Sequence, residues 1–175
     1  MVENLLTVTR IKDNSVNKVK KSPEIVEEVV SEAILRLRRR FPNVKIRVRM
    51  PNNFLMLSMD ATLIEQVLIN LLENACVHSG STDPIDLTIA ESQDSISFTV
   101  RDYGRGIDEN HLPFIFEGQQ IMSGNADGHK GVGIGLSICK TIIQAHGGEI
   151  TASNHSRGAE FTFTLPKEKE DHDNA

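Results

Sequence analysis

Two asparagines that stand four residues apart are the first candidates for chemistry in this sequence. Asn70 and Asn74 lie in a stretch from Asp60 to about His78 whose apolar residues recur at helical spacing, with Asp60 as the expected cap. Both amides therefore project from one face of a helix that is otherwise built for burial. The alternative is a pair of half-buried asparagines that satisfy local hydrogen bonds. The pair becomes informative only together with the glycine-rich segments elsewhere in the chain.

A carboxylate and two glycines follow a predicted strand. The segment Asp102-Tyr103-Gly104-Arg105-Gly106 comes directly after the alternating apolar residues Ile96, Phe98 and Val100. A carboxylate at the end of a sheet can accept the exocyclic amine of adenine, and glycines let the backbone pass close to a flat base. An ordinary Asp-Gly turn is the alternative interpretation.

A third glycine-rich segment leads into a helix predicted from about Gly135 to His146. In Gly131-Val132-Gly133-Ile134-Gly135-Leu136, free backbone N–H groups and the positive end of the helix can together hold phosphate oxygens. The segment lacks the lysine and serine of a Walker loop. It also lacks the preceding strand and acidic partner of a Rossmann site, so it fits neither of those nucleotide-binding motifs.

The remaining pattern predicts the elements that must position these residues. Ser22-Pro23-Glu24 predicts the start of a helix, and residues 46–50 and 54–59 predict a hairpin. Alternating segments at 85–89 and 96–100, and two closing strands at 149–153 and 160–165, predict a sheet. The stretch 102–133 is rich in Gly, Asn and Asp, which is typical of a functional loop or lid.

Length and composition limit the class of protein. The 175 residues suit one domain with a short appendage, and 39% hydrophobic with 25% charged residues exclude a wholly disordered chain. The formal net charge of -5 argues against binding of nucleic acid. Cys76 and Cys139 are expected to be buried thiols in a reducing compartment. No apolar run is long enough to cross a membrane, although an anchor could belong to a longer parent protein.

Four motifs in order resemble the catalytic domain of sensor histidine kinases. They match the family's N, G1, F and G2 boxes, at Asn70-Leu71-Leu72-Glu73-Asn74-Ala75, Asp102-Tyr103-Gly104-Arg105-Gly106, Phe114-Ile115-Phe116 and Gly131-Val132-Gly133-Ile134-Gly135-Leu136. The resemblance covers nearly all of residues 23–166. In residues 63–75 and 133–148 it is strongest to the potassium-responsive branch of the family.

The resemblance implies a fold and a division of the chain. The fold is α+β, the Bergerat ATP-binding fold: a two-layer α/β sandwich in which a mixed sheet packs on about three helices, with an ATP lid. Residues 1–22 resemble the end of the second helix of a dimerisation and phosphoacceptor domain plus a linker. Residues 23–166 would be the ATP-binding catalytic domain, and residues 167–175 a charged tail.

The resemblance also implies a site for Mg²⁺ and ATP, with ADP as the product. Asn74 would ligate Mg²⁺, and Asn70 would support the phosphate and metal region, so these two are the expected catalytic residues. Asp102 would read adenine. The other residues expected to bind the nucleotide are His78, Gly104, Gly106, Phe116, Lys130, Gly131, Gly133, Gly135, Leu136 and Thr162.

The implied activity is donation of the γ-phosphate to a histidine in a separate phosphoacceptor domain, which then passes it to a response regulator. Potassium or osmotic sensing is implied, in the cytoplasmic part of a membrane-anchored bacterial sensor. Neither nucleic acid nor direct membrane contact is expected, and the full-length protein would be a homodimer while this chain alone would be a monomer. None of the six histidines has the context of a phosphoacceptor, so the chain alone should bind nucleotide without phosphorylating itself.

The sequence departs from the family at two places. Val77 stands where many relatives carry a lysine, and Glu117-Gly118-Gln119-Gln120-Ile121 lacks the usual aromatic residues and arginine. Each change removes a charge that could steady phosphates, for which Arg105 or Lys130 could compensate. A degenerate nucleotide-binding or docking module without kinase activity is therefore the alternative. An ATPase or serine kinase of this fold is disfavoured because Asn70 stands where those ATPases carry a catalytic glutamate.

Overall fold

Two sheets and three long helices make up the part of the chain that the computed structural model describes, residues 19–118 and 132–168. The larger sheet has the spatial order β2 (Ile46–Arg49), β4 (Ile85–Glu91), β5 (Ser95–Arg101), β7 (Ala159–Pro166) and β6 (Glu149–Asn154). Strands β1 (Ser22–Ile25) and β3 (Met56–Met59) form a separate antiparallel pair. The helices are α2 (Val26–Arg40), α3 (Ala61–His78) and α4 (Val132–Ala145).

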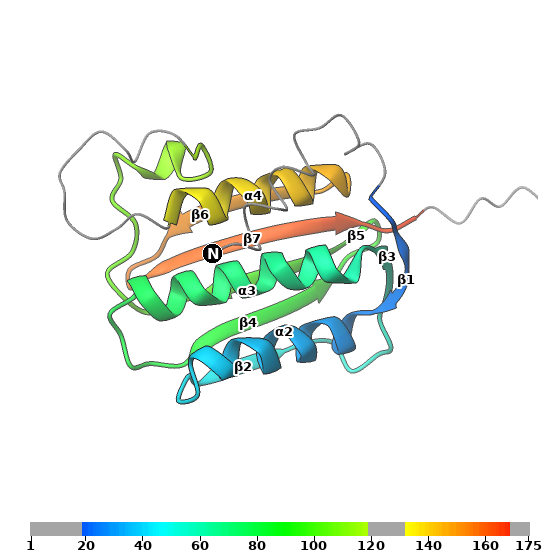
Figure 1. Cartoon of the computed structure of the whole chain (residues 1–175), viewed down its shortest axis with the longest axis horizontal. Helices are drawn as coiled ribbons and strands as arrows, with labels where there is room; N and C mark the ends of the chain where they lie inside the picture. The colour runs from blue at the N-terminus through cyan, green and yellow to red at the C-terminus, as the bar shows by residue number, and fades with distance from the viewer. Residues whose placement is uncertain (1–18, 119–131, 169–175) are drawn as a thin grey trace, which may run out of the picture.

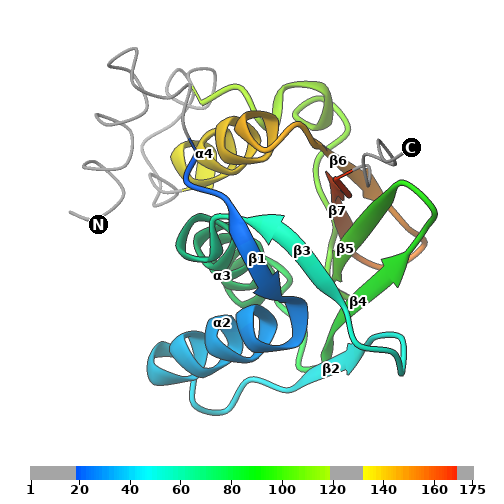
Figure 2. The same cartoon turned by 90° about the vertical axis from the view of Figure 1, so that its right-hand side faces the viewer.

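The helices lie side by side across one face of the larger sheet, with α3 between α2 and α4 (Figure 1). Figure 2 shows the opposite face of this sheet without a covering helix among the described residues. Strand β2 runs parallel to β4, while the other three pairings in the sheet are antiparallel. The predicted two-layer sandwich of a mixed sheet on three helices is therefore confirmed.

Residues along the strands alternate between the two faces of the sheet, which determines both which side chains form the core and on which side Asp102 lies. Ile96, Phe98 and Val100 of β5 are buried toward the helices, and Phe98 stacks on Phe163 of β7 with ring centroids 4.7 Å apart. The intervening residues of β5, such as Thr99, face the uncovered side of the sheet. Because the alternation continues past the strand, Asp102 falls on the helix side of the sheet.

Helix α3 forms where the sequence predicted it. Asp60 caps the helix, since its Oδ1 accepts a hydrogen bond from the Leu63 N–H at 3.2 Å. The helix is buried on both of its flanks because it packs against α2 on one side and α4 on the other. The fully buried residues of its inner surface are Ile64, Val67, Leu68, Leu71 and Leu72.

The predicted hairpin between residues 46–50 and 54–59 is wrong. Strand β2 instead pairs with β4 in parallel, and β3 pairs with β1, with Ile25 opposite Met56. The bend at Asn52 and Asn53 carries the chain from one sheet to the other rather than folding it back on itself. Two short alternating segments around a turn are compatible with either arrangement, so the sequence pattern did not distinguish them.

The predicted helix start at Ser22-Pro23-Glu24 is also wrong. These residues belong to β1, and α2 begins at Val26 after Ile25, which makes no capping hydrogen bond with its side chain. The Ser22 hydroxyl donates to Glu24 Oε1 at 2.5 Å. Proline is acceptable here because β1 is an edge strand, where a missing N–H can face away from the ladder. The apolar stripe of α2 is nevertheless buried as predicted.

Candidate functional site

The N, G1 and G2 boxes come together at one end of the sandwich. The last turn of α3, the loop after β5 and the first turn of α4 all lie at the end of the sheet where β7 begins (Figure 1). Contacts between these segments, described below, show that they are neighbours in space and not only in one view. The site is therefore assembled from segments that are far apart in the sequence.

Asp102 is buried, with one carboxylate oxygen held by the main chain and the other left open. Its side chain is 8% exposed, and Oδ1 accepts hydrogen bonds from the Gly104 N–H at 2.9 Å and the Ala159 N–H at 3.4 Å. Within residues 19–118 and 132–168, Oδ2 has no hydrogen-bond partner. A fixed carboxylate with one open oxygen can accept a hydrogen bond from the amine of a ligand.

The loop after Asp102 is held closely against its neighbours. A Cβ on Gly104 would lie 1.9 Å from the carbonyl oxygen of Ser79, so only glycine fits beside the end of α3. The Arg105 N–H donates to the same oxygen at 3.2 Å. Gly106 has φ +77°, and a Cβ there would lie 2.8 Å from Oδ1 of Asn154 at the end of β6. Both glycines of the G1 box therefore have a steric reason to be glycine.

The two N-box asparagines make different contacts. The Asn70 amide nitrogen donates to the Gly135 carbonyl oxygen at 3.5 Å and to Cys139 Sγ at 3.7 Å, which ties α3 to α4. Half-buried Asn74, one turn further along, has no hydrogen bond to any residue that the structure describes. Asn70 thus has its amide nitrogen engaged within the fold, whereas the Asn74 amide is open to a ligand.

Helix α4 begins at Val132, within the G2 box and three residues before the predicted start at Gly135. Helix α4 includes Gly133 and Gly135, and Leu136 is fully buried in the core between the layers. The N–H groups of its first turn lack helical partners and make this the positive end of the helix. It lies at the same end of the sandwich as the loop that follows β5 (Figure 1). Lys130 and Gly131, also expected in this site, lie outside the described residues.

The F box and the end of α3 border this region. Phe116 is half-buried and packs edge to face on Phe161 of β7, with centroids 6.3 Å apart, and it follows a short 3-10 turn, η1 (Leu112–Phe114). His78 is half-buried in the last turn of α3, next to the residue that contacts Gly104. Beside it, Val77 is 59% exposed, so the position where relatives carry a lysine does face solvent.

Thr162 does not lie beside Asp102, which corrects its expected place at the base. Its Oγ1 lies 2.9 Å from Oγ1 of Thr99 on the neighbouring strand. Its strand neighbour Phe161 is buried toward the helices, so alternation directs Thr162 to the uncovered face of the sheet. The sequence analysis therefore predicted the strand of Thr162 correctly but the wrong face of the sheet.

Groups from other segments complete the Asp102 loop, and the sequence motifs did not identify them. They are the N–H of Ala159, the carbonyl of Ser79, and the side chain of Asn154, whose amide bonds to both main-chain groups of Ile107 at 2.8 and 2.6 Å. Gly158 could have been identified from the sequence, because it is a glycine shortly before the strand predicted at residues 160–165. It has φ +87°, and a Cβ there would lie 2.1 Å from the Asp102 carbonyl oxygen.

Neither thiol near the site is a nucleophile at neutral pH. Burial raises the pKa of Cys139 to about 12, and burial followed by the Glu73 carboxylate raises the pKa of Cys76 to about 11. Cys139 instead packs at the α3–α4 contact, where its Sγ accepts from Asn70 and lies 3.9 Å from the Val67 carbonyl oxygen. The arrangement supports binding through hydrogen bonds and dipoles rather than covalent chemistry.

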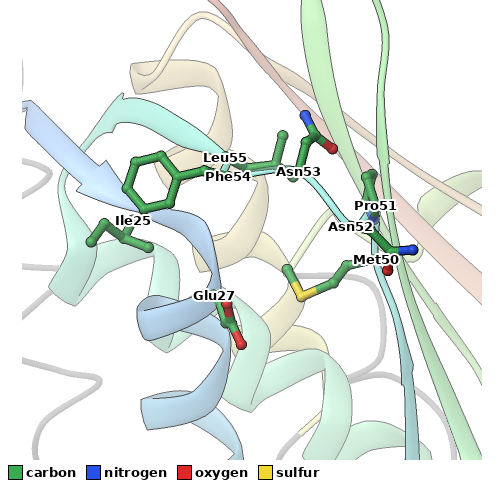
Figure 3. A pocket seen from close by; sticks show the side chains of 8 residues that line it. All are labelled: Ile25, Glu27, Met50, Pro51, Asn52, Asn53, Phe54 and Leu55. Carbon is green, nitrogen blue, oxygen red and sulfur yellow. The ribbon is translucent and has the colours of Figure 1, made fainter.

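A separate hollow of about 420 Å³ lies at the other end of the molecule (Figure 3). It is bordered by Ile25, Met50 and Leu55 beneath the exposed ring of Phe54, with Glu27 on its rim. None of the predicted site residues borders it.

No helix within residues 19–118 and 132–168 is long and apolar enough to span a membrane.

Comparisons with known proteins agree with these motifs. The family described as "Histidine kinase-, DNA gyrase B-, and HSP90-like ATPase" matches residues 59–169. A Clostridium acetobutylicum protein named "Sensor protein KdpD" is 46% identical over 171 residues, which are 96% of this chain and 19% of that protein. The Escherichia coli protein of the same name is 35% identical over 170 residues, with the same coverage of 96% and 19%. The chain thus spans about a fifth of the length of these curated relatives, 19% of each.

Solved structures give the same fold. The catalytic domain of histidine kinase ThkA superposes with a TM-score of 0.72 at 29% identity, covering 85% of this chain and 96% of that one. Full-length ShkA, solved in complex with AMPPNP, superposes with a TM-score of 0.76 at 22% identity, covering 95% of this chain and 35% of that one. The second likeness is one of fold alone.

Proposed function

The chain belongs to the family of histidine kinase-, DNA gyrase B- and HSP90-like ATPases, and on this premise we propose that it is the Mg²⁺–ATP-binding catalytic domain of a two-component sensor histidine kinase. Residues 23–166 form this catalytic domain. It donates the γ-phosphate of ATP to a histidine of a separate phosphoacceptor domain, which passes the phosphate to a response regulator. The resemblance to the potassium-responsive branch, and the two relatives named KdpD, support potassium or osmotic sensing.

The observation that carries the proposal is the state of the Asp102 carboxylate. One oxygen is fixed by two main-chain N–H groups while the other has no partner among the described residues, in a side chain that is 8% exposed. The open oxygen is not one of the fully buried atoms, so it reaches the surface of a residue that is otherwise buried, where it can accept a hydrogen bond from a ligand donor. The exocyclic amine at C6 of adenine is such a donor, whereas guanine carries a carbonyl oxygen, which can only accept, at the same position.

The other residues fit the rest of a nucleotide and its metal. The open amide of Asn74 offers one oxygen ligand, and Mg²⁺ commonly needs few protein ligands because phosphate oxygens and water supply the others. The positive end of α4 suits the phosphates. Gly104 and Gly106 line the base pocket in a loop that packs closely against Ser79 and Asn154. Val77 contributes no charge, so the chain relies on these dipoles and on residues such as Arg105.

Bound ATP supplies the phosphoryl group, and the residues of this chain hold it for transfer. Asp102 fixes the base at one end of the nucleotide, while Asn74 and the start of α4 orient the phosphates at the other. Phosphoryl transfer depends mainly on positioning and charge neutralisation, so a domain that binds and orients ATP needs no nucleophile of its own. The acceptor imidazole belongs to the partner domain.

The wider assembly follows from the same proposal. The full-length protein is a membrane-anchored homodimer whose cytoplasmic part includes this domain, and residues 1–22 lead from the phosphoacceptor helices. The chain alone is a monomer. It contacts its own phosphoacceptor domain and reaches the response regulator through it, with no nucleic acid and no direct membrane contact.

Titration with ATP, with and without Mg²⁺, tests the proposal against an Asp102→Asn variant. Asparagine keeps an acceptor for the Gly104 N–H but turns the open oxygen into a donor that faces the adenine amine. ATP affinity should therefore fall at least about tenfold. Asp94→Asn, with the same change of charge on the exposed turn between β4 and β5, should bind ATP as the wild type does.

The degenerate docking module remains the second candidate because Val77, which is 59% exposed, carries no charge where many relatives have a lysine. Failure of the wild-type chain to bind ATP would contradict the proposal and favour this alternative. Binding followed by transfer to a separately prepared phosphoacceptor domain, measured as phosphohistidine, would favour the kinase. ATP binding without any transfer would leave a nucleotide-binding module that is not a kinase.

A further inference from the structure

A row of alternating charges crosses the uncovered face of the sheet. Strand register places Arg47 of β2 beside Asp86 of β4, Asp86 beside Arg101 of β5, and Arg101 beside Glu160 of β7. Paired residues share one face of a sheet, and Thr99 and Thr162 in the next row face the same way. The row therefore lies on the face of the sheet opposite the helices. It belongs neither to the nucleotide site nor to the core, so neither of these explains why the charges are there.

Tyr103 is anchored on this row. Its hydroxyl donates to Asp86 Oδ2, and the same carboxylate accepts from Arg47 Nε at 2.6 Å and Nη2 at 3.0 Å. The guanidinium of Arg101 lies 5.0 Å from the centroid of the Tyr103 ring, and that of Arg47 lies 5.9 Å away. The Nε of Arg101 is buried without a hydrogen-bond partner in the described chain, while its guanidinium lies over the tyrosine ring.

The anchor carries a full charge at neutral pH. Asp86 is 4% exposed, and burial alone would raise the pKa of its carboxyl. Hydrogen bonds from Arg47 and Tyr103 outweigh burial, so the pKa of Asp86 is lowered and the group stays ionised. Tyr103 therefore donates to a carboxylate, which makes a stronger hydrogen bond than a neutral acceptor would.

The main chain of Tyr103 is held as well. Its carbonyl oxygen accepts from Arg157 Nη2 at 3.2 Å, and the same nitrogen pairs with Asp83 Oδ2 at 2.6 Å. Tyr103 is thus fixed through its side chain on the sheet and through its carbonyl on the turn before β7. Both contacts lie one residue beyond Asp102, where β5 has already ended at Arg101.

Asp102 and Tyr103 are adjacent but face opposite sides of the sheet. Rotation of the peptide segment that moves one side chain must therefore move the other. Among the described residues, the Asp102 carboxylate accepts hydrogen bonds from main-chain groups alone, those of Gly104 and Ala159. The core and the strand ladder hold β4 and β5 together without Tyr103, because Phe98 and its neighbours are fully buried beneath them.

We infer that Tyr103, held by Asp86, is a positioning residue that sets the angle of the Asp102 carboxylate and so determines how strongly the site prefers adenine. The inference rests on the proposed ATP-binding function and adds a specificity device on the far side of the sheet. Loss of the anchor leaves the main-chain hydrogen bonds of Asp102 in place but lets the segment that carries it shift, and a hydrogen bond to a ligand amine weakens steeply when its angle is poor. The contact with adenine's amine should suffer, while contacts with phosphates and sugar should not.

The test compares Tyr103→Phe with the wild type for two ligands, ATP and purine riboside triphosphate, which lacks the amine. Tyr103→Phe keeps the ring and removes only the hydroxyl bonded to Asp86. We expect ATP binding to weaken about three- to tenfold while binding of the analogue stays within about twofold, a loss typical of one hydrogen bond. The thermal midpoint is recorded for every variant.

Two further variants sharpen the test. Asp86→Ala removes the acceptor and should lower the preference for ATP by the same factor, with no further loss in the double variant Tyr103→Phe/Asp86→Ala. Thr99→Val removes another hydrogen bond from the same face of β5, its bond to Thr162, and should leave the preference unchanged.

The outcomes separate the inference from the proposed function. An unchanged preference in Tyr103→Phe, or an equal loss for both ligands together with a lower thermal midpoint, would overturn the positioning role while the proposed function stands. If the wild type binds ATP no better than the analogue, the contact of Asp102 with the amine is absent and the inference falls, although ATP binding itself stands. If the wild type binds neither ligand, the proposed function falls as well. A selective loss of ATP binding in Tyr103→Phe and Asp86→Ala, but not in Thr99→Val, supports the inference.

Discussion

The side-chain nitrogen of Asn70 lies 3.5 Å from the carbonyl oxygen of Gly135, a residue 65 positions later in the chain. This contact joins the N box on α3 to the G2 box on α4. A Cβ on Gly135 would lie 3.8 Å from Asn70 Cγ, which is ordinary contact, so the two helices meet here without strain. The contact shows that the first asparagine of the motif supports the fold, while the second makes no hydrogen bond within the described residues and is the proposed ligand of Mg²⁺.

Substitution of the two asparagines should therefore have different effects. Asn70→Ala removes the donor to Gly135 and Cys139 at a half-buried contact, so the free energy of unfolding should fall by about 1–2 kcal/mol. Asn74→Ala removes no hydrogen bond within the described chain, so stability should change by less than about 0.5 kcal/mol. Both variants should weaken ATP binding in the presence of Mg²⁺. Urea unfolding and ATP titration of the same preparations measure the two effects.

Equal stability of the two variants would contradict this assignment. A second comparison uses titration without Mg²⁺. If Asn74 acts through the metal, the difference between Asn74→Ala and the wild type should shrink when Mg²⁺ is removed. The difference between Asn70→Ala and the wild type should persist, because Asn70 acts through the position of α4.

The sequence predicted those parts of the fold in which one local pattern allows one structure. The Asp60 cap and the long apolar face made α3 unambiguous, and strict alternation gave β5 and β7. Strand pairing is a long-range property, so the partners of β2 and β3 could not be read from residues 46–59. Pro23 suits an edge strand as well as a first helical turn, and only the pairing with β3 decides between them.

The sequence predicted those parts of the candidate site that consist of side chains, but not the main-chain groups that hold them. Asp102 and Asn74 stand out by residue type and motif. The groups that hold the Asp102 carboxylate are the N–H groups of Gly104 and Ala159, and no residue type marks a main-chain donor. Thr162 was misplaced because successive residues of a strand face opposite sides of the sheet. Its neighbour Phe161 is buried toward the helices, so Thr162 faces the uncovered side.

Two glycines with positive φ should differ sharply in their tolerance of alanine. Gly80 has φ +64°, and a Cβ there would meet no atom within 4 Å, so Gly80→Ala should cost only the backbone strain, about 1–2 kcal/mol. Gly158 has φ +87°, and its Cβ would lie 2.1 Å from the Asp102 carbonyl oxygen. Gly158→Ala should therefore cost clearly more than Gly80→Ala in urea unfolding and should also weaken ATP binding. Similar costs for the two variants would show that the main chain around Asp102 moves easily.

The two cysteines should resist alkylation in the folded protein. Burial raises the pKa of Cys139 to about 12, and it is fully buried, so iodoacetamide should label it only after unfolding. Cys76 is half-buried with a pKa of about 11, so it should react slowly at neutral pH and faster as the pH is raised. Mass spectrometry of peptides after timed labelling measures both rates. Rapid labelling of Cys139 would mean that the α3–α4 contact opens readily.

His146 should make the stability of the fold depend on pH. It is 2% exposed, and its Nδ1 lies 2.7 Å from the carbonyl oxygen of Ile142, which can only accept, so Nδ1 carries the proton. Its Nε2 must then accept the hydrogen bond from the Asp60 N–H at 3.1 Å, at the residue that caps α3. Protonation of Nε2 would place a donor against this N–H and break the link between the end of α4 and the start of α3.

The sign of the effect follows from the pKa. Burial lowers the pKa of His146 below 6.5, and nearby Lys21 lowers it further, while the Ile142 carbonyl and Asp60 oppose them less strongly. The unfolded chain therefore binds a proton at a higher pH than the folded chain does. His146 contributes its full stability above about pH 6.5, and this contribution is lost as the pH falls through that value, by at most about 1.4 kcal/mol per pH unit.

A His146→Gln variant isolates this contribution from that of the carboxylates, which titrate in both proteins. We expect the variant to be less stable than the wild type at about pH 7.5, with the two free energies of unfolding converging as the pH falls toward about 5. Urea unfolding at a series of pH values gives the difference curve directly. If that difference stayed constant across the series, His146 would titrate alike in the folded and unfolded states, and its neutral link to Asp60 would not hold α3 and α4 together.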